Sequence, residues 1–204
     1  IEYTKKGWIS RNRFLLNGQP ETFSLPIKKD SDFLDVCERQ LSETASAEKH
    51  KLIRRLDAAY RKAAYFREGK SLLDDIFAST ETNLFRFIYK SIEQVRGRLG
   101  MTNRLIVSST LDIPRQLKGL NRVIAICKAL EATDYINSIG GIDLYDKEAF
   151  CAEGIQLYFH KVQPLQYHQF QNAFVPNLSI LDSIMFTGIE GVRKSLTKMD
   201  ICAP

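Results

Sequence analysis

The chain has 204 residues, of which 44% are hydrophobic and 26% charged, and a formal net charge of +5. This length and composition fit one globular domain with a sizeable core, and the modest positive charge permits anionic partners without choosing among them. The sequence lacks a 20-residue apolar run, a signal peptide and any cysteine or histidine metal motif, which predicts a cytoplasmic protein without a membrane span or bound metal.

The chain opens with a basic stretch that leads into a predicted β-hairpin. The stretch is KKGWISRNR, residues 5–13. Apolar runs at 13–17 and 22–27 then flank Asn17 and Gly18, a pair that supplies the positive φ angles of a tight turn. We therefore expect two antiparallel strands near the start of the chain.

Two amphipathic helices follow the hairpin. Apolar residues recur every three or four positions over 48–66 and over 81–99, and a short helix is expected between them at 72–78. Together they form a helical region at residues 48–100. The first helix also has a basic face, made of Lys51, Arg54, Arg55, Arg61 and Lys62. A solvated surface is the favoured interpretation of this face, and a nucleic-acid or phosphate surface is the alternative.

The second half of the chain alternates between strand and helix patterns. Strands are predicted at 104–109, 134–138 and 155–162, with a helix at 115–132 and a short helix, KEAFCAE, before the third strand. Strand–helix–strand order favours parallel pairing. The predicted fold class is therefore α/β, with a mostly parallel sheet flanked by helices, an N-terminal hairpin and a helical insertion, all in one domain over residues 1–204.

Polar residues follow two of the predicted strands. The strand ends are at Ser109 and at Asn137, and the second leads into Gly140 and Gly141. Ligands of α/β sheets bind beyond the carboxyl ends of the strands, and a Gly-Gly pair lets backbone amides approach a phosphate. A plain strand exit followed by a turn explains the same residues and is the favoured interpretation.

The basic stretch at 5–13 has the residue types of a ligand site. It holds the single tryptophan of the chain, Trp8, close to Arg11, Asn12 and Arg13. Guanidinium groups bind phosphate or carboxylate through two donors, and an indole stacks on a sugar or a base. A surface strand with Trp8 packed inward and the arginines in water is an equal alternative on chemistry alone.

Residues 167–186 predict a loop that leads into a helix. Ser179 and Asp182 form an S-x-x-D pair before an apolar run, which is typical of a capping box with Asp in place of Glu. An exposed helix start also attracts anions. The sequence contains no G-x-S-x-G or similar nucleophile motif, so no catalytic residue is assigned.

Four separated segments together resemble the WbqC-like protein family. They are KKGWISRNR, YINSIGGIDLY (135–145), FCAEGIQLYF (150–159) and YHQFQNAFVPNLSILDSIMF (167–186). The resemblance is collinear over nearly the whole chain. It implies a bacterial protein of O-antigen or other surface-polysaccharide biosynthesis, a transferase that moves a small acyl or amino-acid group such as glycine onto a sugar. It also implies a strand, a Pro- and aromatic-rich loop and a helix ahead of the position of Ile1.

The resemblance also implies a set of substrate-binding residues. They are Lys6, Trp8, Arg11, Asn12, Arg13, Ser109, Tyr135, Asn137, Gly140, Gly141, Tyr145, Tyr167, Gln169, Ser179 and Asp182. The expected partner is an anionic small molecule such as a nucleotide sugar or an activated acyl donor, and no cofactor is evident other than such a nucleotide-linked donor. A non-enzymatic binding or assembly protein of the polysaccharide machinery is the second hypothesis, and a nucleic-acid binder is ranked last.

Overall fold

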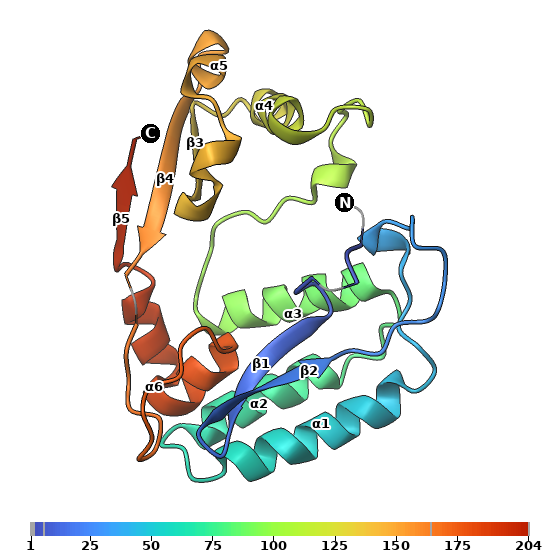
Figure 1. The fold of residues 1–204 in the computed structure, drawn as a ribbon, viewed down its shortest axis with the longest axis vertical. Coiled ribbons are helices and arrows are strands. Elements are labelled where there is room, and N and C mark those ends of the chain that lie inside the picture. Colours follow the sequence, from blue (N-terminus) through green and yellow to red (C-terminus); the bar gives the residue numbers. More distant parts are fainter. Residues whose placement is uncertain (1–2, 6, 164, 204) are drawn as a thin grey trace. The chain divides into compact units, whose positions relative to one another are not determined.

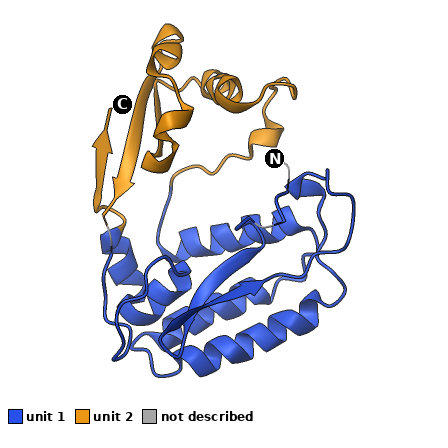
Figure 2. Ribbon diagram, in the orientation of Figure 1, with its two compact units in different colours: residues 1–102, 165–195 blue, residues 103–164, 196–204 orange. Residues whose placement is uncertain are grey.

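The computed structural model describes residues 3–5, 7–163 and 165–203 (Figure 1). Contacts divide the chain into two compact units (Figure 2). The first unit is Ile1–Thr102 with Leu165–Ser195, and the second is Asn103–Pro164 with Leu196–Pro204. None of the described helices combines the length and the apolar character of a membrane span.

The first unit begins with the predicted hairpin. Strand β1 (Arg11–Leu16) pairs antiparallel with β2 (Gln19–Ser24). The turn residues Asn17 and Gly18 have φ angles of 51° and 75°, the left-handed conformations that this two-residue turn requires. The hairpin prediction is therefore confirmed, with both strands starting a few residues earlier than expected.

Helices make up most of the rest of the first unit. They are α1 (Ala45–Tyr60), α2 (Phe66–Phe77), α3 (Leu84–Arg98) and α6 (Ile180–Ser195), with a 3-10 turn η1 (Val36–Glu38) before α1. The helix predicted at 48–66 ends at Tyr60, where a turn begins with the amide of Ala63 donating to the Tyr60 carbonyl at 2.7 Å. In this break the amide of Tyr65 donates to the carbonyl of Met185 at 2.9 Å. The short helix predicted at 72–78 is correspondingly longer and begins at Phe66.

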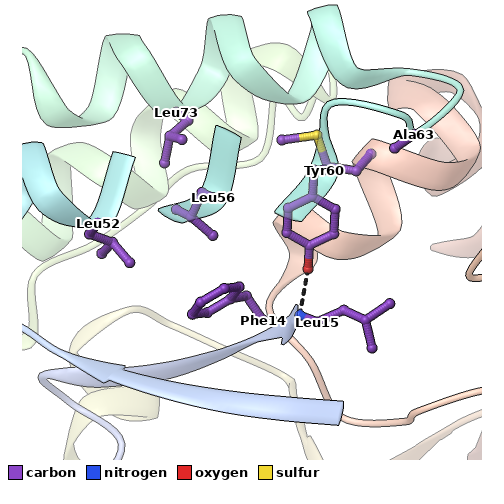
Figure 3. Close-up of a cluster of buried hydrophobic side chains, with 8 residues drawn as sticks. Phe14, Leu15, Leu52, Leu56, Tyr60, Ala63 and Leu73 are labelled. Carbon is purple, nitrogen blue, oxygen red and sulfur yellow. Dashed lines mark hydrogen bonds between the residues drawn. The ribbon is translucent and has the colours of Figure 1, made fainter. Parts of the chain in front are cut away.

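A cluster of buried apolar side chains joins β1 to the helices of this unit (Figure 3). Phe14 and Leu15 are neighbours on β1, and each is only 1% exposed. Adjacent strand residues point to opposite faces, so β1 is covered on both sides. Leu52, Leu56 and Tyr60 of α1 pack in the same cluster, and the amide of Leu15 donates to the Tyr60 hydroxyl at 2.7 Å (Figure 3).

The second unit has a small mixed sheet. Its helices are α4 (Gly119–Ala129) and α5 (Lys147–Ala152), and its strands are β3 (Asp134–Ser138), β4 (Gln156–Val162) and β5 (Met199–Cys202), in the order β3-β4-β5. The predicted parallel pairing of β3 with β4 is confirmed. Strand β5 pairs antiparallel with β4, so the fold is mixed α/β and the prediction of a mostly parallel sheet is wrong.

The strand predicted at 104–109 is also wrong. Residues 104–107 have no regular secondary structure, and Ser108–Thr110 form a 3-10 turn, η2. An apolar, β-branched run becomes a strand only where a neighbouring strand supplies the backbone partners, and no described strand pairs with this run. The sequence does not predict strand β5, because its four residues are all exposed and show no alternation between buried and exposed positions. It forms a strand because β4 supplies the backbone partners.

Candidate functional site

The predicted substrate-binding residues are divided between the two units. The first unit contains Trp8, Arg11, Asn12, Arg13, Tyr167, Gln169, Ser179 and Asp182. The second contains Ser109, Tyr135, Asn137, Gly140, Gly141 and Tyr145. Lys6 lies outside the described residues. Each group has a different physical character.

Trp8, Arg11 and Arg13 form one cluster at the start of β1, called here the Trp8 cluster. Because side chains alternate along a strand, Arg11 and Arg13 lie on the same face. Their guanidinium carbons are 5.3 Å and 4.9 Å from the centroid of the Trp8 ring. The indole is 55% exposed, so it does not pack inward as the alternative interpretation expected. Two cations therefore lie against one exposed aromatic ring.

The two guanidinium groups of the Trp8 cluster have unused donors. The Nε atoms of Arg11 and Arg13 are buried and have no hydrogen-bond partner, and no ion pair with either arginine is present among the described residues. Nearby cations differ, since Arg55 pairs with Glu21 and Lys5 with Asp32, each at 2.6 Å. A buried donor without an acceptor costs about 1–3 kcal/mol. An anion that accepts from these groups would remove that cost.

Asn12 has a local role beside this cluster. Its side-chain Oδ1 accepts a hydrogen bond from the backbone amide of Arg13 at 2.8 Å. Because successive residues of a strand point to opposite faces, Asn12 lies on the face opposite Arg11 and Arg13. In the structure, Asn12 therefore stabilises the start of β1 and does not face the Trp8 cluster.

Asp182 is the centre of a second, buried cluster of the first unit. It is 0% exposed, and its carboxylate accepts from the hydroxyls of Tyr60 and Tyr167, each at 2.7 Å, and from Nε2 of Gln169 at 2.8 Å. Burial raises the pKa of Asp182, and it also raises the pKa of both tyrosines, which keeps them protonated as donors. These four residues are called here the Asp182 cluster.

The Asp182 cluster ties together segments that are far apart in the sequence. Oε1 of Gln169 accepts from the backbone amide of Val175 at 2.6 Å, and Nε2 also donates to the Val175 carbonyl at 3.1 Å. The Tyr60 hydroxyl accepts from Leu15 of β1 while it donates to Asp182. The cluster therefore fixes the loop before α6 to α1 and β1, which is a structural role.

The capping box predicted for Ser179 and Asp182 is only half present. Ser179 Oγ accepts from the amide of Leu181 at 3.3 Å, as a helix cap does. The Ser179 amide, however, donates to the carbonyl of Arg13 at 2.8 Å, and the Asp182 carboxylate points into the buried cluster. Asp182 is thus no cap, because buried hydroxyl and amide donors compete successfully for its oxygens.

The predicted residues of the second unit mainly pack on one another. The Tyr135 ring stacks on Phe150 with centroids 5.3 Å apart and meets Tyr145 edge-on at 5.7 Å. Burial raises the pKa of Tyr135. A Cβ added at Gly141 would lie 2.9 Å from Nδ2 of Asn137, so this glycine makes room for the Asn137 amide. These contacts give the residues a packing role.

Ser109 and Gly140 are the two residues of this group with free space around their side-chain positions. Ser109 is exposed in η2 and does not end a strand, and a Cβ added at Gly140 would meet nothing. Of the two predicted strand-end residues, Asn137 lies in a described strand, β3, and Ser109 does not. Among the described residues there is also no group of three His, Cys, Asp or Glu residues that would hold a metal ion.

The structure adds two residues that the sequence patterns did not single out as polar site residues. Tyr60 is placed by its spacing on the apolar face of a helix, and only the fold brings its hydroxyl to Asp182. Arg39 is 3% exposed, and the only sequence signal for it is an arginine in a polar loop. A basic residue in a loop is ordinarily solvated, so the sequence pattern does not predict that Arg39 is buried.

The fold is mixed α/β, and a cluster of two arginines and one exposed indole lies at the start of its first strand. The chain belongs to the WbqC-like protein family, whose model matches residues 1–194. It is also 25% identical over 193 residues to the uncharacterized protein Rv1507c of Mycobacterium tuberculosis, a match that covers 93% of this chain and 82% of the relative. No solved structure matches it significantly.

Proposed function

We propose that the protein binds an anionic, ring-containing metabolite at the Trp8 cluster and acts in the assembly of bacterial surface polysaccharide. The supporting observation is the pair of guanidinium groups with unused Nε donors against one exposed indole. A nucleotide sugar has the matching chemistry, since its phosphates accept from guanidinium groups and its rings stack on an aromatic face. The polysaccharide context rests on the family resemblance.

The proposed reaction is transfer of a small acyl or amino-acid group, glycine-like, onto a sugar. A hydroxyl or amine of the sugar forms the new bond to the carbonyl carbon of an activated donor. The bond from that carbon to the leaving group breaks, and the proton of the attacking group passes to solvent. Arg11 and Arg13 hold the anionic part, so catalysis comes from positioning and charge stabilisation.

A non-enzymatic binding or assembly protein is the second candidate. The observation that favours it is the composition of the Trp8 cluster. Arginine stays protonated and the indole nitrogen only donates, so neither side-chain type of this cluster acts as a general base. A binding protein of the polysaccharide machinery requires the same anion contacts and no base.

Ligand binding is tested with a thermal-shift and calorimetric screen of nucleotides, nucleotide sugars and aminoacyl donors. Charge-assisted hydrogen bonds contribute about 1.5–3 kcal/mol, so Arg11→Met or Arg13→Met should weaken binding of a hit by roughly tenfold or more. Arg54→Met is the matched control, since Arg54 is an exposed arginine of α1. Equal affinities of the wild type and both site variants would contradict the proposed site.

The polysaccharide role is tested in the native organism. The coding gene is deleted and the repeat unit of the surface polysaccharide is analysed by mass spectrometry. We expect loss of a small acyl or aminoacyl substituent, restored by the wild-type gene and by Arg54→Met but not by Arg13→Met. An unchanged repeat unit after deletion would overturn the role in polysaccharide assembly.

A further inference from the structure

Arg39 is a nearly fully buried arginine outside the Trp8 cluster. It follows the η1 turn and is 3% exposed. Its backbone is held at both ends, since its amide donates to the carbonyl of Val36 at 3.3 Å and its carbonyl accepts from the amide of Leu84 at 2.9 Å. The backbone from which the Arg39 side chain projects is therefore fixed by the fold of the first unit.

Two donors of Arg39 are unused. Its Nε and Nη2 atoms are buried and have no hydrogen-bond partner. In a guanidinium group these two N–H bonds lie along one edge and point the same way, which matches two oxygens of a carboxylate or phosphate. Buried charges are ordinarily paired, because an unpaired one loses its hydration without compensation.

The described neighbours of Arg39 do not supply the missing acceptor. Its guanidinium carbon lies 4.9 Å from the centroid of the Tyr3 ring, which is an aromatic contact with no oxygen acceptor at the fork. Asp32 is near enough for Arg39 to contribute, after Lys5, to the lowering of its pKa, but this carboxylate is bound to Lys5 at 2.6 Å. No ion pair with Arg39 is formed among the described residues.

We infer that Arg39 is a second anion-binding point, which takes the two oxygens of a phosphate or carboxylate group with its Nε and Nη2 edge. The Tyr3 ring supports the guanidinium group by the cation–π contact, and the Tyr3 hydroxyl is fixed to Ser10 Oγ at 2.9 Å. This point differs from the Trp8 cluster, because it has one buried guanidinium fork in place of two guanidinium groups on an exposed indole. The chemistry of the fork matches an oxoanion.

The test compares melting midpoints in sodium chloride, sodium phosphate and sodium acetate at equal ionic strength. The probes are inorganic phosphate and acetate, and the variants are Arg39→Met, Arg39→Lys and the control Arg54→Met. At a tenfold excess over the dissociation constant, bound anion should raise the wild-type midpoint by about 3–6 °C. The larger rise, with phosphate or with acetate, identifies which oxoanion the site prefers.

Both Arg39 variants should show a smaller rise than the wild type, while Arg54→Met keeps it in full. Arg39→Lys retains the charge and lacks the fork, so a reduced rise in this variant shows that the two-donor edge is required. If Arg39→Met does not fold, Arg39→Lys still decides. Equal rises in the wild type and both Arg39 variants, or no rise in the wild type with either anion, would overturn the inference.

The double variant Arg11→Met, Arg13→Met separates this inference from the proposed function. We expect the anion-induced rise to persist in the double variant and to vanish when Arg39→Met is added. A rise that disappears in the double variant and stays in the Arg39 variants would overturn the second anion-binding point and leave the Trp8 cluster as the anion site.

Discussion

The Trp8 cluster and the Asp182 cluster both contact β1, but they differ in whether their hydrogen-bonding groups have partners. Asp182 is fully buried and receives three hydrogen bonds from Tyr60, Tyr167 and Gln169. In the Trp8 cluster the indole is 55% exposed and the Nε atoms of both arginines have no acceptor. The polar groups of the Asp182 cluster are therefore satisfied within the fold, whereas the two Nε donors of the Trp8 cluster are not.

The two clusters are connected through the backbone of β1. The amide of Leu15 donates to Tyr60 of the Asp182 cluster, and the carbonyl of Arg13 accepts from the amide of Ser179 at the start of α6. The backbone that carries the Arg13 side chain is therefore fixed at two points. The Asp182 cluster thus supports the strand on which Arg11 and Arg13 lie.

The largest expected effect comes from removal of the Asp182 carboxylate. Asp182→Ala leaves three donors without an acceptor, at about 1–3 kcal/mol each, so the free energy of unfolding should fall by at least about 3 kcal/mol. Urea unfolding measures this loss, and Asp143→Ala, at an exposed position, is the control. A decrease in the free energy of unfolding of less than about 1 kcal/mol would contradict the structural role of the Asp182 cluster.

A smaller, pH-dependent effect follows from the charge state of Asp182. Burial raises its folded-state pKa above the unfolded value of about 3.9. A raised carboxyl pKa contributes stability that is fully present below the unfolded pKa and is lost as the pH rises through the folded pKa. The stability of the wild type relative to Asp182→Asn should therefore decrease from about pH 4 upward.

This pH dependence is measured by urea unfolding of both proteins from acidic to neutral pH. In the difference between their free energies of unfolding, the contributions of the other titrating groups cancel. A wild-type advantage that grows with rising pH would mean that the folded protein prefers the ionised carboxylate. Asp182 would then act as a charge whose hydrogen bonds outweigh its burial.

The smallest expected effect on stability comes from Trp8. Trp8→Ala should change the free energy of unfolding by no more than about 0.5 kcal/mol, because the indole is mostly exposed. Its effect on ligand affinity should be on the order of tenfold or more, since an aromatic stack contributes about 1–3 kcal/mol. Trp8→Phe should restore part of the affinity. A large loss of stability in Trp8→Ala would instead assign the indole to the fold.

Local patterns predict much of this structure. The Asn17-Gly18 turn, the strands at 134–138 and 155–162 and the helix at 81–99 follow from turn chemistry and from periods of two and 3.6 residues. The closeness of Trp8 to its two arginines is also local, because all three lie within six positions. Such features depend on near neighbours, and near neighbours are visible in the sequence.

Features that depend on distant segments are not visible in this way. The run at 104–109 has strand composition but no described strand pairs with it, while β5 has little strand character and pairs with β4. Within the break between α1 and α2, the amide of Tyr65 donates to the carbonyl of Met185, 120 positions away. Each of these features involves the presence or absence of a remote partner for backbone hydrogen bonds.

The sequence by itself determined the α/β class, the hairpin and the basic-aromatic character of residues 5–13. Only the tertiary structure decided that Asp182 is buried in a satisfied cluster, that Tyr135 and Tyr145 pack in the core, and that Arg11, Arg13 and Arg39 keep unused donors. The physical reason is that residue type sets which bonds a side chain can make. Burial and the choice of partner, which set the free energy of those bonds, arise from segments that meet only in the folded chain.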